Sequence, residues 1–201
     1  MELFNHFLLI LKLEKVDRKS EIIHIAAKLF RERGFKAVSM RDIAKSLDIK
    51  AASLYNHIQS KQEILMLLII NIAEEFTREM NLLKDSNEMA IDTLKKIIDI
   101  HIDITLRDPD AIACLNNDWM HLDKEHRAYY IKMRDEYEEN VREIVKRGID
   151  NGEIKEHNIE VIVFSMLSTL RTFYLWYGRK MKLNPTEFKE SLTQVLIQGI
   201  V

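Results

Sequence analysis

The chain has 201 residues, of which 47% are hydrophobic and 31% are charged. This composition is that of a folded globular protein and excludes a disordered chain. Five glycines and two prolines are few, which favours long helices over a sheet protein rich in turns. The single cysteine, Cys114, excludes a disulfide framework within one chain and indicates a reducing, cytoplasmic location.

The net charge of −2 conceals an asymmetry along the chain. Residues 1–62 contain 12 basic and 7 acidic side chains, a net charge of +5, whereas residues 63–201 contain 18 and 25, a net charge of −7. A basic N-terminal segment ahead of an acidic body suggests that only the N-terminal part meets a polyanion. Chance fluctuation would produce the same pattern, so charge alone does not decide.

An apolar run at the N-terminus, Leu3 to Leu13, is eleven residues long. A membrane-spanning helix needs about 20 residues, and a secretory signal has a basic start and a small-residue cleavage site. Here Glu2 comes first and a charged stretch follows. Residues 1–16 are therefore expected to be an N-terminal extension, either an extra amphipathic helix or sequence upstream of the functional start, and not a membrane anchor.

An amphipathic helix is predicted ahead of Gly34, where a helix should end. Its apolar residues recur three and four apart: Ile22, Ile25, Ala26, Leu29 and Phe30. A second, short helix should begin at Ser39, with Asp42 completing a capping box, and end near Leu47. Asp48 follows at a sharp turn, because Asp tolerates the left-handed backbone conformation better than most non-glycine residues.

A third short helix is expected over residues 50–58. Ser60 and Glu63 then form a second capping box, which begins a long helix that runs to about Leu83. Three short helices therefore lead into one long helix.

The remainder is predicted to be helical, without strands, internal repeats or low-complexity segments. The expected helices cover residues 89–106, 111–122, 125–148, 161–177 and 187–200. Pro109 and Pro185 mark two of the boundaries between them. Asp103 and Arg107, four residues apart on one helix, are expected to form an ion pair. These patterns together indicate an all-α protein.

Two short helices joined by a tight turn indicate a helix-turn-helix, whose second helix enters the major groove of DNA. Such a helix needs small residues where the backbones approach, short polar side chains in its first turn, and groups at its rim that reach phosphates. The small residues are Ala51 and Ala52, and the short polar side chains are Lys50 and Ser53. The groups at the rim are Tyr55, His57 and Lys61. Arg41, in the preceding helix, can reach the opposite backbone strand.

Residues 34–65 closely resemble the DNA-binding domain of TetR-family transcriptional regulators. The shared positions are Gly34-Phe35, Ser39-Met40-Arg41, Ile43-Ala44, Leu47-Asp48-Ile49, Leu54 to Ile58 and Lys61 to Ile64. Asp48 departs from the glycine that the family usually has. The resemblance implies a TetR-like, all-α fold, with a helix-turn-helix DNA-binding domain at residues 17–62 and a helical ligand-binding and dimerisation domain at residues 63–201.

The resemblance also implies which residues meet double-stranded operator DNA. The implied set is Ser39, Met40, Arg41, Lys50, Ala51, Ser53, Tyr55, Asn56, His57 and Lys61. Within it, Lys50, Ala51 and Ser53 would face base edges. Tyr55 and His57 would contact phosphates, and Lys61 would hold another at a helix N-terminus, where the helix dipole favours an anion. Each of these side chains could instead be solvated surface, and Asn56 has no firm role.

Members of the family bind DNA as homodimers, and here the last two helices, residues 161–177 and 187–200, are the candidates for the dimer contact. A helix that is apolar nearly all round suits such an interface, although it could equally be core. The family also encloses a ligand pocket. The candidates for this pocket are Met66, Ile70, Ile98, His101, Thr105, Trp119, Met133, Tyr137, Met166, Arg171 and Tyr174. For each of them, ordinary core packing is the alternative.

A weaker resemblance covers residues 117–154 and 175–178. These segments look like the C-terminal domain of TetR-family regulators of lipid and aromatic-acid catabolism, several of which sense acyl-coenzyme A (acyl-CoA) thioesters. An acyl-CoA needs an apolar slot and cations for its phosphates, which Arg134, Arg142, Lys146 and Arg171 could supply. The same residues could simply fix the fold.

The sequence gives little support for metal binding or catalysis. His101, His121, His126 and His157 lack the close spacing of a metal site, and no phosphate loop, nucleophile elbow or metalloprotease helix occurs. We therefore predict a DNA-binding repressor, not an enzyme and without a cofactor, that a small apolar or amphipathic ligand releases from its operator. The alternatives are a TetR-fold DNA-binding protein acting through a protein partner, and a small helical enzyme with an incidental helix-turn-helix.

Overall fold

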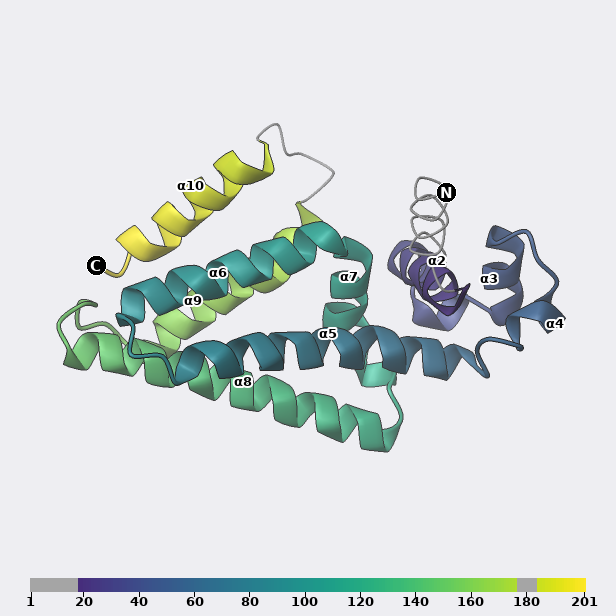
Figure 1. Cartoon of the computed structure of the whole chain (residues 1–201), viewed down its shortest axis with the longest axis horizontal. Coiled ribbons are helices and arrows are strands. Elements are labelled where there is room, and N and C mark those ends of the chain that lie inside the picture. The colour runs from purple at the N-terminus through teal and green to yellow at the C-terminus, as the bar shows by residue number, and fades with distance from the viewer. Residues whose placement is uncertain (1–17, 177–183) are drawn as a thin grey trace, which may run out of the picture.

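The computed structural model describes residues 18–176 and 184–201, and the predicted N-terminal extension lies outside these residues. All regular elements within them are helices (Figure 1). They are α2 (Arg18–Arg33), η1 (Phe35–Ala37), α3 (Met40–Ser46), α4 (Ala51–Leu54), α5 (Lys61–Lys84), α6 (Ala90–Arg107), α7 (Pro109–Asn117), η2 (Trp119–His121), α8 (Lys124–Asp150), α9 (Ile159–Thr172), η3 (Phe173–Leu175) and α10 (Pro185–Gln198), where η denotes a 3-10 helix. The prediction of an all-α fold is confirmed.

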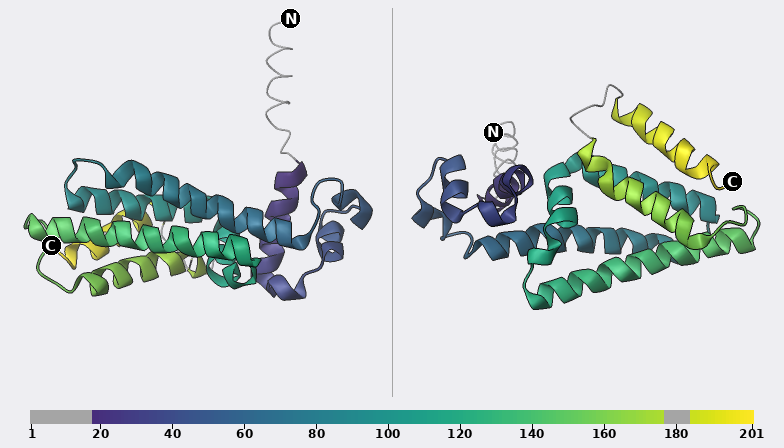
Figure 2. Two further views of the ribbon diagram at one scale, coloured as in Figure 1. Left: turned by 90° about the horizontal axis from the view of Figure 1, so that it is seen from below. Right: turned by 180° about the vertical axis from the view of Figure 1, so that it is seen from behind.

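The helices form two groups that share α5 (Figures 1 and 2). A small head, residues 18–60, holds α2, α3 and α4 at one end of α5. The larger body, residues 61–176 and 184–201, holds the other helices. In it α8 runs alongside α5, and α6 and α9 complete the bundle. The predicted division between residues 62 and 63 falls in the first turn of α5, so this helix extends from the head through the body.

Capping residues set where the helices begin. The Ser39 hydroxyl accepts from the backbone N–H of Asp42 at 3.2 Å, and the Asp42 carboxylate accepts from the N–H of Ser39 at 2.8 Å, which is the predicted capping box. Ser60 likewise accepts from the N–H of Glu63 at 3.0 Å. The Glu63 carboxylate, however, accepts from the N–H of Gln59 and from the Lys19 ammonium. The second capping box is therefore only half formed, because other donors hold its carboxylate.

Two other details of the predicted elements differ from the structure. The third short helix covers only Ala51–Leu54, and turns follow it, because the chain must redirect before α5 begins at Lys61. The last apolar helix ends at Thr172 and continues as the 3-10 helix η3, while Tyr177, its predicted last residue, lies outside the described residues.

The predicted ion pair between Asp103 and Arg107 is wrong. Lys189 of α10 donates to the Asp103 carboxylate at 3.0 and 3.1 Å, and Arg107 donates to Glu75 of α5 at 2.8 Å. Partners from neighbouring helices compete with the contact along one helix, which is worth only about 0.2–0.5 kcal/mol.

A single apolar core continues from the head into the body. Ile43, Leu54 and Ile58 are buried in the head, where α3 packs against both α2 and α4. Cys114 of α7 is buried against α2, with its Sγ 3.8 Å from the carbonyl oxygen of Ala27. The core therefore holds the head in a defined orientation on the body.

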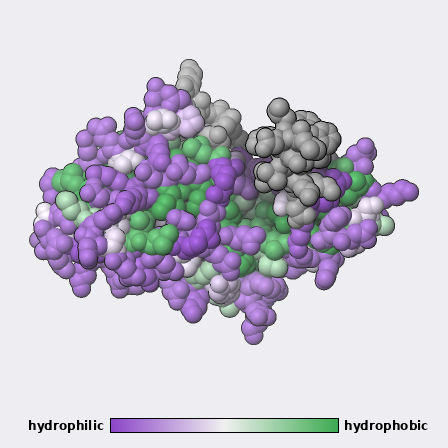
Figure 3. Space-filling model, in the orientation of Figure 1, coloured by the Kyte–Doolittle hydropathy of each residue, from purple (hydrophilic) through white to green (hydrophobic). Residues whose placement is uncertain are grey.

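The surface is mainly hydrophilic on the face that Figure 3 shows, with hydrophobic side chains gathered in separate patches. Within residues 18–176 and 184–201, no helix is both long and apolar enough to cross a membrane.

Gly148 allows α8 to pack closely against its neighbours, which leads to a first prediction. A Cβ atom at this position would lie 2.9 Å from the Cβ of Ala90 and 2.6 Å from the Cδ1 of Ile154. Gly148→Ala should therefore destabilise the protein by about 1–3 kcal/mol through overpacking, despite the better helix propensity of alanine.

Gly199→Ala is the matched control, since its Cβ would make only an ordinary contact, 3.6 Å from the Val195 carbonyl oxygen. Urea unfolding at one fixed protein concentration compares the two variants. Equal stability of the two would contradict the close packing at Gly148.

Candidate DNA-binding and ligand-binding sites

The turn between α3 and α4 orients the second helix of the helix-turn-helix. Asp48 has a φ of 52°, which confirms the left-handed conformation predicted from its position. The N–H of Ile49 donates to the carbonyl oxygen of Ala44 at 3.0 Å and closes the turn. Lys50 is extended and forms the N-cap of α4. The family's glycine is therefore replaced by a residue that still adopts the required conformation.

The predicted DNA-contacting residues lie at the start of α3, in α4 and the turn after it, and at the start of α5, and most of them are exposed. Ser39, Arg41, Lys50, Ser53, Tyr55, Asn56 and His57 are exposed, while Met40, Ala51 and Lys61 are half-buried. A shallow depression between α3 and α4 includes Arg41, Lys45 and Lys50 along its walls. Lys45 was not among the predicted contacts, although its position four residues after Arg41 places both on one face of α3.

Lys61 has structural partners inside the head. Its ammonium donates to the carbonyl oxygens of Phe35 and Val38, at 2.7 and 2.6 Å, and lies 4.3 Å from the centroid of the Phe35 ring. Partial burial lowers the pKa of this ammonium. Because an ammonium has three N–H donors, one remains beyond these two bonds, and the predicted phosphate contact stays a prediction.

A pocket lies in the body between α5, α6, α7, α8 and α9, with about 550 Å³ of empty space including its part open to solvent. Its lining combines apolar side chains with a few polar ones, as small-molecule sites do. The lining residues are Ala73, Phe76, Thr77, His101, Thr105, Ile112, Leu115, Asn116, Tyr130, Met133, Arg134, Tyr137, Leu170 and Arg171.

Two buried rings form the polar centre of this pocket. The Nε2 atom of His101 lies 2.9 Å from the Tyr137 hydroxyl, and the Phe76 ring packs against both rings. Burial, with a smaller effect from the charge of Arg171, lowers the pKa of His101 to about 3. Burial also raises the pKa of Tyr137. Both groups are therefore uncharged at neutral pH and offer a ligand hydrogen bonds without charge.

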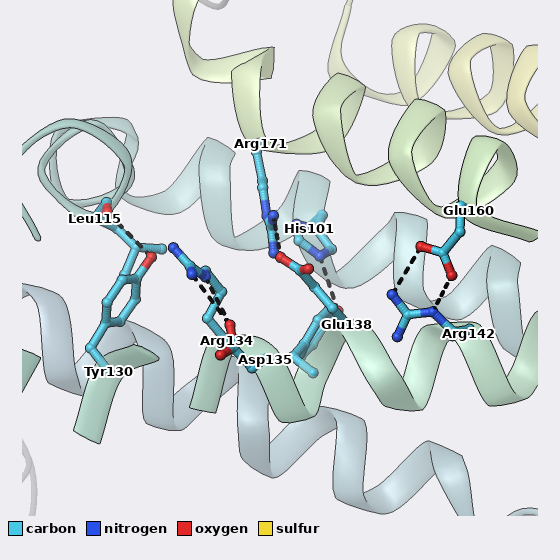
Figure 4. Close-up of polar contacts among 10 residues, drawn as sticks. His101, Leu115, Tyr130, Arg134, Asp135, Glu138, Arg142, Glu160 and Arg171 are labelled. Carbon is cyan, nitrogen blue, oxygen red and sulfur yellow. Dashed lines mark hydrogen bonds and ion pairs between the residues drawn. The ribbon is translucent and has the colours of Figure 1, made fainter. Parts of the chain in front are cut away.

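Charged side chains occupy the rim of the pocket (Figure 4). The Nη1 atom of Arg171 on α9 lies 2.8 Å from a carboxylate oxygen of Glu138 on α8. Arg134 pairs with Asp135 at 3.2 Å, and its guanidinium lies 5.3 Å from the centroid of the Trp119 ring. The rim thus contains two cations, each beside a carboxylate.

Five of the eleven predicted pocket residues line this pocket: His101, Thr105, Met133, Tyr137 and Arg171. The other six, Met66, Ile70, Ile98, Trp119, Met166 and Tyr174, are not part of its lining. Ile98 is fully buried core, for example, and the Tyr174 hydroxyl donates to the Asn117 side chain at 3.1 Å. Phe76, Tyr130 and Leu170 belong to the lining but were not predicted, since helical periodicity marks buried positions without showing which border empty space.

Arg142 and Lys146, the remaining candidates for phosphate binding, are not part of the lining. Arg142 is bound by Glu139 and by Glu160 of α9, with 2.6 Å between its Nε atom and the Glu160 carboxylate. Lys146 is exposed. No metal site appears either: within the described ranges, no three His, Cys, Asp or Glu side chains are grouped so that they could hold an ion.

Exposed apolar side chains mark one further face of the body. Val161 and Phe164 on α9 are 60% and 71% exposed, and Val195 on α10 is 69% exposed. A groove between these two helices contains Val161 and Val195 in its walls. Contiguous apolar surface of this kind is typical of a protein interface.

Comparison with known proteins shows the family. The pattern of bacterial regulatory proteins of the tetR family matches residues 22–67, and that of the Tetracyclin repressor-like C-terminal domain matches residues 87–200. Since the second match alone spans more than half of the chain, the protein belongs to the TetR family. The resemblance inferred from residues 34–65 is thereby confirmed.

Individual relatives agree with this assignment. The transcriptional repressor KstR2 of Rhodococcus jostii (strain RHA1) is 24% identical over 165 residues, which is 81% of each chain. The structure of the ketosteroid transcriptional regulator KstR2 of Mycobacterium tuberculosis superposes with a TM-score of 0.86, at 19% identity over 94% of this chain and 97% of that one.

The structure of AibR in complex with isovaleryl coenzyme A and operator DNA has a TM-score of 0.76, at 22% identity over 90% of this chain and 98% of that one. These structural likenesses show a shared fold. The family and its relatives are DNA-binding transcriptional regulators, so the chain is a TetR-family DNA-binding transcriptional regulator and not an enzyme.

Lys61→Met separates the two roles of Lys61. Loss of two hydrogen bonds from a charged donor should destabilise the protein by about 1–3 kcal/mol. If Lys61 also contacts a phosphate, the slope of log K against log salt for operator binding should fall by about one. The exposed Lys36 of η1 provides the control Lys36→Met. Unchanged stability in urea unfolding would contradict the structural role, and an unchanged salt slope would contradict the phosphate contact.

His101 should make the protein sensitive to acid. Between pH 6.5 and about 3, the unfolded chain takes up a proton at this residue and the folded chain does not, so stability falls as the pH falls. His101→Gln keeps a hydrogen-bonding group beside Tyr137 but does not titrate. Between pH 7 and pH 5 the wild type should lose about 2 kcal/mol more than this variant.

Urea unfolding at the two pH values measures this difference, and His57→Gln, at an exposed position, is the control. An equal loss of stability in the wild type and His101→Gln would show that the imidazole of the folded protein titrates normally.

Proposed function

We propose that the protein represses transcription by binding its operator through the exposed residues of α3, α4 and the turn after α4, and that a small apolar or amphipathic ligand in the body pocket releases it. The observation that carries this proposal is the position of α7, one helix that borders both the pocket and the head. The proposed domains are residues 17–62 for DNA and residues 63–201 for ligand and dimer, and the proposed location is the cytoplasm, where operator DNA lies.

The DNA-contacting roles follow from where each side chain lies. Lys50 and Ser53 are exposed at the start of α4, the end of a recognition helix that reaches base edges. Tyr55 and His57 are exposed in the turn after α4, where they would reach phosphates at the edge of the groove. We propose that Lys50 and Ser53 face the bases, with Ser53 as the base reader, and that Tyr55, His57 and Lys61 position the helix on the backbone.

The proposed dimer contact uses the exposed face of α9 and α10. Phe164 and Val195 project from this face with more than half of their surface exposed. Burial of such side chains in a second copy of the chain removes apolar surface from water, at about 25 cal/mol per Å². A two-fold arrangement of these helices would set a fixed distance between the two heads, as operator half-sites one or more helical turns apart require.

Ligand binding would reach the head through α7. Ile112, Leu115 and Asn116 line the pocket, whereas Asp110 and Cys114 of the same helix contact α2. Arg31 of α2 lies 2.8 Å from the Asp110 carboxylate. A ligand that binds more tightly to a state with a shifted α7 would therefore favour a shifted α2 and head as well. Such a difference in affinity between two states is what allosteric release requires.

An acyl-CoA thioester is the proposed candidate for the ligand. The pocket has an apolar interior and two guanidinium groups, Arg134 and Arg171, at its rim. The fold neighbour AibR was crystallised with isovaleryl coenzyme A, and another neighbour is described as a ketosteroid regulator. Both names suggest an apolar group as the part that enters the pocket.

Mobility shift with DNA from upstream of the protein's own gene tests this function. Ser53→Ala should change which sequences bind, whereas Lys61→Met should weaken all of them and reduce the salt slope by about one. Lys146→Ala, an exposed lysine of the body, is the control and should change neither. An acyl-CoA that fits the pocket should dissociate the complex.

Two results would contradict the proposal in different ways. Absence of sequence-specific binding at moderate salt would remove the repressor function. Specific binding that neither acyl-CoA thioesters nor other small apolar compounds relieve, together with a co-purifying protein, would favour the alternative of regulation by a protein partner.

A further inference from the structure

One ion pair joins two helices across the rim of the body pocket. Arg171 comes from the last turn of α9 and Glu138 from α8, with 2.8 Å between Nη1 and the carboxylate. The two side chains are 33% and 32% exposed. An ion pair that is open to water to this extent contributes little to stability, so its exchange for another partner costs little.

The two members of the pair differ in their relation to the pocket. Arg171 lines the pocket, and its charge helps to lower the pKa of His101, which lies deeper in the same space. Glu138 is not part of the lining. Figure 4 shows Arg171 reaching from α9 down to Glu138, with His101 behind the guanidinium. The guanidinium can therefore be approached from two sides, by Glu138 from the rim and by a ligand from the pocket.

Arg171 also has donors to spare. A guanidinium carries five N–H groups, and in the described part of the chain the hydrogen bond of its side chain to Glu138 uses only Nη1. Its backbone is held as well, because the Asn116 amide donates to the carbonyl oxygen of Arg171 at 3.2 Å and to that of Ile112 at 2.9 Å. Arg171 is thus fixed on α7 through its backbone while its side chain can change partner.

Building on the proposed function, we propose that the ligand carries an oxyanion that replaces Glu138 as the partner of Arg171. The oxyanion is a carboxylate or a phosphate, and the apolar part of the ligand extends toward Phe76 and the uncharged pair of His101 and Tyr137. Two oxygens of such a group match the planar fork of a guanidinium. Glu138 then turns to water, and this ion pair between α8 and α9 is lost, while that between Arg142 and Glu160 remains.

The exchange has a consequence for regulation. It breaks a link between α8 and α9 at the level where Asn116 ties α9 to α7. Because α9 carries the exposed apolar face proposed as the dimer contact, the same event would act on the dimer and, through α7, on the head. In the free protein, Glu138 therefore occupies the position at Arg171 that the ligand anion would take.

Isothermal titration of the full-length dimer with three probes tests the exchange: octanoate, octanoyl-CoA and the uncharged methyl octanoate. Glu138→Gln removes the competing carboxylate and should bind the anionic probe about tenfold more tightly than the wild type, given the strength of a charged hydrogen bond. Arg171→Met should bind it about tenfold or more weakly. Glu143→Gln, an exposed carboxylate of α8 away from the pocket lining, should behave as the wild type.

The probes also identify the source of the oxyanion. A response of octanoate to Glu138→Gln indicates a carboxylate, and a response of octanoyl-CoA alone indicates a phosphate. Three results would contradict the proposed exchange of Glu138 for a ligand oxyanion. Methyl octanoate could bind as tightly as both anions, or Glu138→Gln and Glu143→Gln could bind the probes alike. The third is that neither anion binds the wild type or Glu138→Gln. Operator binding, measured on the same samples by mobility shift, tests the proposed function separately. If Arg171→Met does not fold, the comparison of Glu138→Gln with the wild type still tests the exchange.

Discussion

The packing of α7 between α2 and the pocket is the contact on which the rest of the structure depends. Asp108 caps the helix by accepting from the N–H of Ala111 at 3.0 Å, and Pro109 occupies its first turn, where a missing N–H does no harm. On one side Cys114 is buried against Ala27 of α2, and on the other Leu115 borders the pocket. A helix of nine residues thus gives the head its orientation and the pocket one of its walls.

Burial and exposure divide the body's polar groups into two kinds. His101 and Tyr137 are buried together and held in their uncharged forms, because a desolvated charge would be expensive. Arg134 and Arg171 remain partly exposed and keep both their charge and their carboxylate partners. In the proposed function, the interior would therefore select a ligand by shape and neutral hydrogen bonds, and the rim would select it by charge.

Local chemistry explains which parts of the fold could be predicted from the sequence. Capping by Ser39, the turn at Asp48 and the motif of residues 34–65 depend on neighbours within a few positions, so the head and its family were predicted. The partners of Lys61, Asp103 and Arg107 come from other elements, which spacing along the chain does not show. The pocket was predicted only in part, because Ile98 and His101 are both buried on α6 but only His101 lines the pocket.

The 24 residues of α5 give the molecule a mechanical property as well as a scaffold. At 1.5 Å per residue this helix is about 36 Å long, with the head at one end (Figure 1) and the pocket beside Ala73, Phe76 and Thr77. As a stiff lever, it would turn a tilt of about 5° into a displacement of about 3 Å at its far end. In the proposed dimer, two such levers would change the separation of the heads by several ångströms, so a small adjustment at the pocket would be enough to move both heads out of register with the DNA grooves.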